Sequence, residues 1–163
     1  MDSKIRIKIL TVGGTIDKVY FDEKSTYFVG ESLVGEILRA ANVSFEYECE
    51  SILSKDSLDM TEADRQLVFD KVNSDTHRHI VLTHGTDTMI QTAKRLKSIA
   101  NKVIVLTGSM QPARFKSSDA EFNVGFAIAA VQCLPPGVYI AMNGRIFDPD
   151  KVRKNRDLNR FVA

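Results

Sequence analysis

Short apolar runs rich in β-branched residues recur along the chain, and each is ended by a turn signal. Four of them, at 5–12, 79–84, 102–108 and 137–143, predict buried strands. A fifth segment, 43–50, alternates apolar and polar residues, which is typical of a half-exposed or edge strand.

Segments with a helical period lie between these strands. Residues 31–41 place three apolar side chains on one face: Leu33, Ile37 and Leu38. Residues 88–100 place four along one stripe: Met89, Ala93, Leu96 and Ala100. Both patterns predict amphipathic helices that cover a sheet.

Two further helices are predicted from their starts. Thr61 is followed three residues later by an acid, as in a capping box, and so is Ser118, with Glu121. The segment 117–133 is apolar nearly all round, so we expect it to pack deep in the core.

Alternation of strands and helices predicts an α/β, three-layer sandwich with a mainly parallel sheet. The last 20 residues show no clear period, and no repeat or linker interrupts the chain. We therefore expect residues 1–163 to form a single domain.

Composition narrows the function classes. The chain has 44% hydrophobic and 26% charged residues and a formal net charge of +1, so no global field points to nucleic acid or a membrane surface. No apolar run approaches the ~20 residues of a membrane span, and the N-terminus lacks a secretory pattern. These features predict a cytoplasmic protein.

The cysteines and histidines offer little chemistry on their own. Cys49 and Cys133 lie far apart, which favours two buried thiols in a reducing compartment over a disulfide. His77 and His79 would point the same way, but no third metal ligand is evident, so we expect no metal site. His84 is expected to orient its neighbours or to bond within the core.

Ligands of open parallel sheets bind beyond the carboxyl ends of the strands. The segments expected there are "GGTID", "HGTDTM", "GSMQPARF" and "NGRIFD". Glycine lets backbone N–H groups approach a ligand closely. Four residues in these segments are therefore candidates for substrate binding: Gly14, Gly85, Ser109 and Met110.

Each motif also has a purely structural interpretation. "GGT" can be a tight turn, since the Walker lysine and the GxGxxG spacing are absent. Thr86 or Asp87 can cap the following helix, and the loop "SKDSLDMTEAD" is ordinary before a helix. Spacing alone does not favour Lys154 over Lys151.

Taken together, "TVGGTID", "VLTHGTDTM", "VIVLTGSMQP" and "AMNGRIFDPDKVRK" resemble the N-terminal domain of the bacterial-type L-asparaginases. The resemblance runs in order from about residue 6 to the end of the chain. It implies hydrolysis of the side-chain amide of asparagine, or a related small ω-amide, without metal or organic cofactor.

The resemblance also implies roles for the residues that match the family's motifs. Thr15 of "GGTI" is similar to the nucleophile, and Tyr27 of "TYFVG" to the tyrosine of a closing flap. Ser57 of "DSLDM" would grip the substrate. The remaining matches are Thr86 and Asp87 of "HGTDT" and Lys154, six residues past Asp148.

A threonine hydroxyl needs a neighbour that takes its proton, and either Tyr27 or Thr86 can do so. Thr86 would be backed by Lys154 if burial keeps that amine neutral. Asp87 is the expected partner of the substrate ammonium, and N–H groups of the two Gly-Thr turns can form an oxyanion hole.

Two departures bear on function. Family members carry a second, C-terminal domain, and this chain stops where that domain would begin. Leu58 also stands where some relatives have a polar substrate contact, and "KNRD" replaces a threonine-rich run. We expect a homodimer or higher homo-oligomer. The alternatives to an amidohydrolase are a binding module with little turnover and an ammonia-releasing component of an amidotransferase.

Overall fold

The computed structural model describes residues 4–20 and 27–163. Its centre is a six-stranded sheet in which five strands are parallel and the last is antiparallel at one edge. The predicted α/β fold with a mainly parallel sheet is confirmed. Across the sheet the strands are β4 (Glu46–Lys55), β1 (Arg6–Gly13), β5 (His79–Thr83), β6 (Val103–Thr107), β7 (Gly137–Met142) and β8 (Arg145–Phe147).

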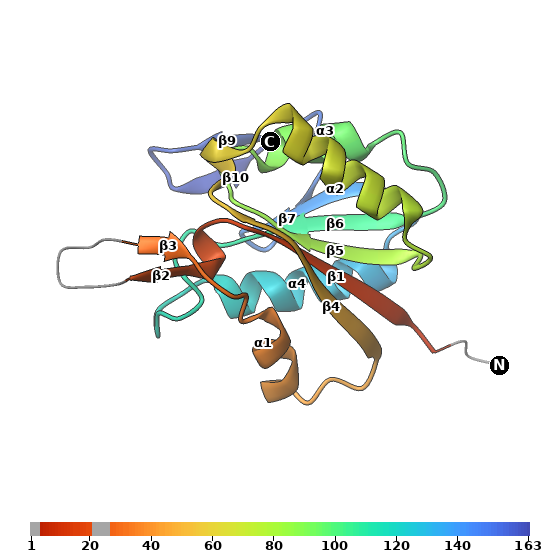
Figure 1. Cartoon of the computed structure of the whole chain (residues 1–163), viewed down its shortest axis with the longest axis horizontal. Coiled ribbons are helices and arrows are strands. Elements are labelled where there is room, and N and C mark those ends of the chain that lie inside the picture. Colours follow the sequence, from red (N-terminus) through yellow and green to blue (C-terminus); the bar gives the residue numbers. More distant parts are fainter. Residues whose placement is uncertain (1–3, 21–26) are drawn as a thin grey trace.

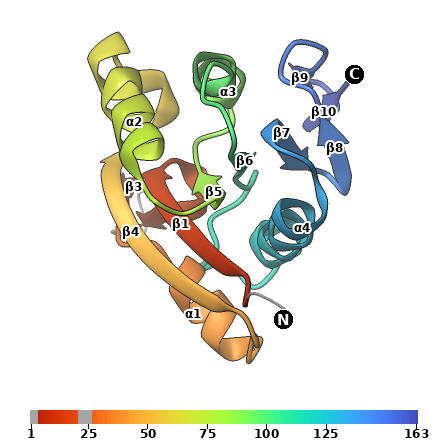
Figure 2. The ribbon, with the colours of Figure 1, turned by 90° about the vertical axis from the view of Figure 1, so that its right-hand side faces the viewer.

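Helices cover both faces of this sheet (Figure 1 and Figure 2). On one face lie α2 (Glu62–Ser74) and α3 (Met89–Leu96), and on the other α1 (Val34–Ala40) and α4 (Ala120–Cys133). Alternate residues of β1 point into opposite layers: Leu10 joins the α2–α3 core, whereas Ile9 joins the α1–α4 core. Burying each such side chain stabilises the fold by about 1.5–3 kcal/mol.

Two short antiparallel hairpins extend from this sandwich. One pairs β2 (Lys18–Tyr20) with β3 (Tyr27–Val29), and the other pairs β9 (Arg153–Asn155) with β10 (Arg160–Val162). Both lie at the end of the molecule away from the N-terminus (Figure 1). Residues 21–26 of the predicted polar flap lie outside the described residues.

The C-terminal segment contains strands that its sequence did not reveal. Each of β8, β9 and β10 is three residues long, too short to show a period of two. Phe161 of β10 is 2% exposed and packs with its ring centroid 6.5 Å from that of Phe147, which anchors the hairpin to the α2–α3 core.

The predicted edge strand is confirmed in place but not in extent. β4 lies at the edge of the sheet but begins at Glu46 and continues to Lys55, five residues beyond the predicted end. The added residues are "SILSK", in which Ile52 and Leu53 pack against the α2–α3 core, and the pairing with β1 extends to Gly13 and Lys55.

The capping box of α2 is present as predicted. The Thr61 hydroxyl accepts a hydrogen bond from the Asp64 N–H at 3.1 Å, and the Asp64 carboxylate accepts one from the Thr61 N–H at 2.9 Å. These contacts satisfy two N–H groups that a helix start leaves free.

The predicted capping box of α4 is wrong. Asp119, not Ser118, is the N-cap, and its carboxylate accepts hydrogen bonds from the loop N–H groups of Met110 and Gln111. The helix is also not buried all round, because its outer side faces away from the sheet and Phe122 there is 63% exposed.

Two other expectations about burial are wrong. Ala100 does not continue the buried stripe of α3, because the helix ends at Leu96 and the chain then buries Ile99 instead. Cys49 and Cys133 are exposed rather than buried, since one lies on the edge strand and the other ends α4. Both are free thiols.

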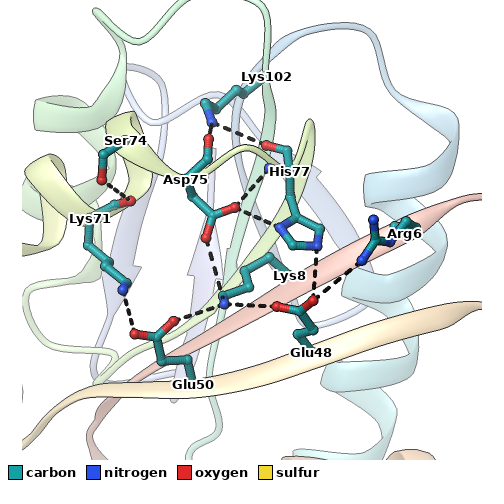
Figure 3. Close-up of polar contacts among 9 residues, drawn as sticks. All are labelled: Arg6, Lys8, Glu48, Glu50, Lys71, Ser74, Asp75, His77 and Lys102. Atoms are coloured by element: carbon teal, nitrogen blue, oxygen red, sulfur yellow. Dashed lines mark hydrogen bonds and ion pairs between the residues drawn. The ribbon is translucent and has the colours of Figure 1, made fainter.

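At the amino ends of the strands, on the face covered by α2 and α3, charged side chains stand in place of apolar ones (Figure 3). Lys8 continues the row of β1 side chains that includes Leu10, and its ammonium contacts three carboxylates. They belong to Glu48 and Glu50 of β4, at 3.2 and 2.8 Å, and to Asp75 after α2, at 3.7 Å. The end of α2 is thereby tied to the sheet by ion pairs.

Among the described residues, no helix is both long enough and apolar enough to cross a bilayer.

Candidate active site

Glycines bring the turns at the carboxyl ends of three strands into contact. Gly14, after β1, has φ 89°, and a Cβ there would lie 2.3 Å from the Gly85 Cα after β5. A Cβ on Gly85 would lie 2.6 Å from that of Ser57, which follows β4. Neither glycine can take a side chain without a backbone shift. Because Thr15 and Thr86 directly follow these glycines, the contact places the two threonines in abutting turns.

Ser57 is held by the turn that carries Thr86. It is 2% exposed, its hydroxyl accepts a hydrogen bond from the Thr88 N–H at 3.3 Å, and its carbonyl accepts one from the Thr88 hydroxyl at 2.8 Å. The first contact uses an acceptor site of the Ser57 hydroxyl and not its donor.

Lys154 reaches the same turn from hairpin β9–β10. Its ammonium donates to the Thr86 hydroxyl at 2.8 Å and to Asp87 Oδ1 at 2.9 Å. The side chain of Lys154 is 16% exposed, and Thr86 is buried. Lys151, three residues earlier, is exposed. Of the two lysines that spacing did not distinguish, Lys154 is therefore the one that contacts this turn.

The His84 side chain is bonded to the backbone of the same turn. Its ring is fully buried, with Nδ1 2.7 Å from the Gly85 carbonyl and Nε2 2.8 Å from the Thr92 hydroxyl. Because a carbonyl only accepts, these contacts assign the proton to Nδ1. Burial lowers the pKa of His84 to about 4, so the ring is neutral near pH 7.

Ser109 and Met110, predicted to bind substrate, lie in a loop that is bonded internally. The Ser109 hydroxyl donates to the Gln111 carbonyl, and the Met110 N–H donates to the Asp119 carboxylate at about 3.0 Å. Asn123 of α4 bonds both the Gly108 carbonyl and Asp119. The Met110 N–H is therefore committed to Asp119 rather than to a ligand, and contact of this loop with substrate stays a prediction.

Tyr27 lies on β3 of the lid hairpin β2–β3, hereafter the lid. Its side chain is 46% exposed and meets the ring of Tyr20 edge-on at 5.9 Å. Tyr20 in turn stacks on Phe115, at 5.4 Å, in the loop after β6. The Lys18 ammonium lies 4.0 Å from the centre of the Tyr27 ring.

Sequence reasoning missed charged contacts around these residues. Lys18 pairs with Asp56 at 3.0 Å, although 38 positions separate them, and Arg156 pairs with Asp87 at 3.3 Å. Desolvation alone would raise the pKa of Asp56, but the Leu58 N–H and Lys18 outweigh it and the pKa is lowered. Nothing local in the sequence marks either Lys18 or Arg156, because their partners lie far away in the chain.

Within the described ranges, no cluster of three or more histidine, cysteine or acidic side chains is placed to hold a metal ion. Of the two histidines at the start of β5, His77 and His79, the His77 ring lies 2.7 Å from Asp75, within the charged network of Figure 3.

The segments expected at this end of the sheet all lie within a match to a known protein family. The family model described as "Asparaginase, N-terminal" matches residues 6–161. The chain belongs to the asparaginase family. This confirms the resemblance on which the site residues were chosen, although it does not test their individual roles.

Known members of the family align with nearly the whole chain. The "Glutaminase-asparaginase" of Acinetobacter glutaminasificans is 32% identical over 98% of this chain and 53% of the relative, and "L-asparaginase 2" of Escherichia coli is 31% identical over 91% and 46%. The thermostable L-asparaginase of Thermococcus kodakarensis superposes with a TM-score of 0.82 at 29% identity, covering 98% of this chain and 51% of that one.

The chain thus spans about half the length of the relatives it matches. A glutamyl-tRNA(Gln) amidotransferase component of Methanococcus vannielii is also similar, with 31% identity over 87% of this chain and 35% of the relative. Relatives include one titled "Probable Cytoplasmic L-asparaginase", from Campylobacter jejuni, and one named "Probable L-asparaginase periplasmic", from Haemophilus influenzae.

Proposed function

We propose that this protein is an amidohydrolase that releases ammonia from L-asparagine or a related small ω-amide, with Thr15 as the nucleophile. The observation that carries the proposal is the Lys154 ammonium bonded to both Thr86 and Asp87, in a turn that abuts the turn of Thr15. Membership of the asparaginase family supports it.

In the proposed first step, the Thr15 hydroxyl oxygen attacks the carbonyl carbon of the amide. Its proton passes to the amide nitrogen through Tyr27, or through the Thr86 hydroxyl, which the Lys154 ammonium orients, and the nitrogen leaves as ammonia. The acyl group stays on Thr15 as an ester. Water then attacks this ester, releases the carboxylic acid and restores the hydroxyl.

The negative charge that develops on the amide oxygen needs hydrogen-bond donors. The Gly14 N–H is already bonded to the Lys55 carbonyl at 2.9 Å, so we assign this role to the N–H groups of Thr15 and Thr86. One such donor lowers the barrier by about 3 kcal/mol.

Substrate binding follows from the groups around the threonines. Ser57 keeps a donor for a substrate carboxylate, and Asp87 is the acidic group of the site that faces hairpin β9–β10. Closure of the lid over the two threonine turns would bring Tyr27 to Thr15 and exclude water. In this mechanism no metal or organic cofactor takes part.

The test is ammonia release from L-asparagine and L-glutamine by the purified protein, its Thr15→Ala and Lys154→Met variants, and Lys151→Met as a matched control. We expect Thr15→Ala to lose at least about a thousandfold in kcat and Lys154→Met about a hundredfold, with Lys151→Met unchanged. Full hydrolysis by Thr15→Ala would rule out the nucleophile, and a wild-type kcat for Lys154→Met would make that lysine structural.

The same measurements separate two other functions. No ammonia from either amide, together with thermal stabilisation by aspartate, would identify a binding module with little turnover. Ammonia released only when a second protein is added would identify a component of an amidotransferase. The similarity to the Methanococcus vannielii amidotransferase component motivates that arm of the experiment.

The predicted homodimer or higher homo-oligomer also stays a prediction. A second copy that covers the lid would enclose the site. Light scattering coupled to size-exclusion chromatography gives the mass directly, and a monomer of 18.2 kDa at micromolar concentration would contradict the prediction.

A further inference from the structure

Two cations from one hairpin share a single oxygen of Asp87. Lys154 Nζ lies 2.9 Å and Arg156 Nη2 3.3 Å from Asp87 Oδ1. Lys154 is in β9, and Arg156 follows directly after that strand. The side chain of Arg156 is 72% exposed, so it lies on the solvent side of the pair.

With its two cationic partners, Asp87 presents a net positive rather than a negative charge to a ligand. One carboxylate faces two cations, so the three side chains together carry a net positive charge. Asp56 is the other carboxylate that Lys154 influences, and Lys18 neutralises it at 3.0 Å. A ligand that approaches Asp87 from the solvent therefore meets the Arg156 guanidinium.

An α-ammonium group is a poor ligand for such a carboxylate. It would lie within a few ångströms of a guanidinium of the same sign, and like charges at that distance repel. A carboxylate or a neutral group at this position meets no such repulsion, and a carboxylate gains from the positive charge.

We propose that Arg156 is a specificity-determining residue, and that the site prefers ω-amides which carry a carboxylate but no free α-ammonium group. Succinamate and N-acetyl-L-asparagine represent this class. The inference rests on the proposed amidohydrolase function, since it concerns the substrate of the same site.

The experiment compares kcat/KM for succinamate, N-acetyl-L-asparagine and L-asparagine in the wild type, Arg156→Gln and Arg156→Lys. Arg153→Gln is the matched control, because Arg153 is an exposed arginine of the same hairpin. We expect the wild type to favour succinamate over asparagine by about tenfold, and Arg156→Gln to remove that preference, mainly through KM. Arg156→Lys should keep most of it, and Arg153→Gln all of it.

A preference for asparagine in the wild type, or a ratio that Arg156→Gln leaves unchanged, would overturn the inference while the amidohydrolase proposal stands. If no amide is hydrolysed, the amidohydrolase proposal fails, and thermal stabilisation by succinate and by L-aspartate decides the inference. Stronger stabilisation by succinate that Arg156→Gln abolishes supports it. Equal stabilisation, or none by either acid, overturns it.

Discussion

The carboxyl group of Asp17 lies in the turn Thr15–Asp17 and is almost completely enclosed, at 1% exposure. Among the described residues, its Oδ1 atom has no hydrogen-bond partner. Burial raises the pKa of Asp17 to about 6, although the Ser32 hydroxyl and Arg114 oppose the shift. The ionised carboxylate of Asp17, close to the predicted nucleophile Thr15, therefore lowers the stability of the folded protein.

The pH dependence of stability tests this cost. Because the pKa of Asp17 is about 6 in the folded protein and about 3.8 unfolded, the folded state binds more protons between these values, and stability falls as pH rises through that window. Asp17→Asn removes the titration. We expect the variant to gain about 2–3 kcal/mol over the wild type at pH 7.5 but only about 0.5 kcal/mol at pH 4, measured by urea unfolding.

A stability difference between Asp17→Asn and the wild type that is the same at both pH values would show that the carboxyl group is not the cause. His84 titrates in the opposite direction over the same range, because its pKa is lowered to about 4. It is present in both proteins, so its contribution cancels in the comparison.

Residues in a local motif could be singled out from the sequence as candidates, whereas residues whose contacts cross the fold could not. "HGTDT" marked Thr86 and Asp87 because its composition exceeds what a helix cap needs. Lys18 and Arg156 look like ordinary surface charges, since their partners lie 38 and 69 positions away in the chain. No pattern along the sequence encodes such a pair.

At the scale of elements, the lid is attached to the Ser57 loop by one ion pair. Lys18 of β2 bonds Asp56 at 3.0 Å, and the two side chains are only 13% and 21% exposed. Desolvation lowers the pKa of Lys18, but Asp56 and Tyr27 outweigh it and the pKa is raised. The pair links the lid strand to the turn that begins at Ser57.

A double-mutant cycle measures this attachment. We expect the free energies of unfolding of Lys18→Met, Asp56→Asn and the double variant to give a coupling of about 1–3 kcal/mol, because each single change leaves a partly enclosed group unpaired. We also expect KM for the amide to rise in Lys18→Met, since the lid loses its tether. Urea unfolding and steady-state kinetics give the two quantities.

The control for this cycle is Lys97→Met, which breaks exposed ion pairs with Asp148 and Asp150. Exposed pairs contribute at most about 1 kcal/mol, so its effect should be small. Additive effects of Lys18→Met and Asp56→Asn, within about 0.3 kcal/mol, would mean that this ion pair does not hold the lid.

The starts of α2 and α4 show which helix boundaries can be predicted from the sequence and which cannot. The start of α2 was predictable because the capping partners, Thr61 and Asp64, are both local. The start of α4 was not, because Asp119 bonds the loop after β6 and leaves Ser118 to accept from Ala120. The contact between Asp119 and the loop after β6, rather than a local pattern, determines which residue is the N-cap of α4.

At the scale of the whole molecule, the two ends of the parallel strands are held differently. Their carboxyl ends meet through glycine contacts, whereas their amino ends meet through the charged network around Lys8 (Figure 3). The hydrogen bond to Glu50 is the largest cause of the raised pKa of Lys8. Burial alone would raise the pKa of Asp75, but its contacts with His77 lower it.

Removal of the Lys8 charge should destabilise the protein over a wide pH range. A raised pKa makes the contribution of Lys8 complete below about pH 10.5, and it is lost as pH rises through the folded value. The lowered pKa of Asp75 makes its contribution complete above about pH 3.8, and it is lost as pH falls through the folded value. We expect Lys8→Met to cost about 3 kcal/mol at pH 7 and less at pH 3.

Urea unfolding of Lys8→Met against Lys4→Met checks this expectation. Lys4 is 82% exposed and pairs with Glu46 at 3.7 Å, so its removal should cost less than about 0.5 kcal/mol. Equal losses in the two variants would show that burial adds nothing to the Lys8 network.

The general arrangement of the molecule could be predicted because four of the five parallel strands are short apolar runs and its helices have clear periods. That arrangement alone placed the four candidate segments at one edge of the sheet. The exposed thiols of Cys49 and Cys133 could not be predicted, because an apolar residue type does not specify which side of an edge strand or helix end it occupies.

The contact of Gly14 with Gly85, and of Gly85 with Ser57, also affects how mutational scans of this protein should be read. A methyl group at either glycine would displace the turn of a predicted catalytic threonine, so alanine there should abolish activity as completely as loss of the nucleophile. Neither glycine supplies a reacting group. A mutational scan would therefore not distinguish residues that shape the turns from residues that take part in the reaction. Natural variation at Gly14, Gly85 and Ser57 should be correlated rather than independent, because their contacts depend on one another.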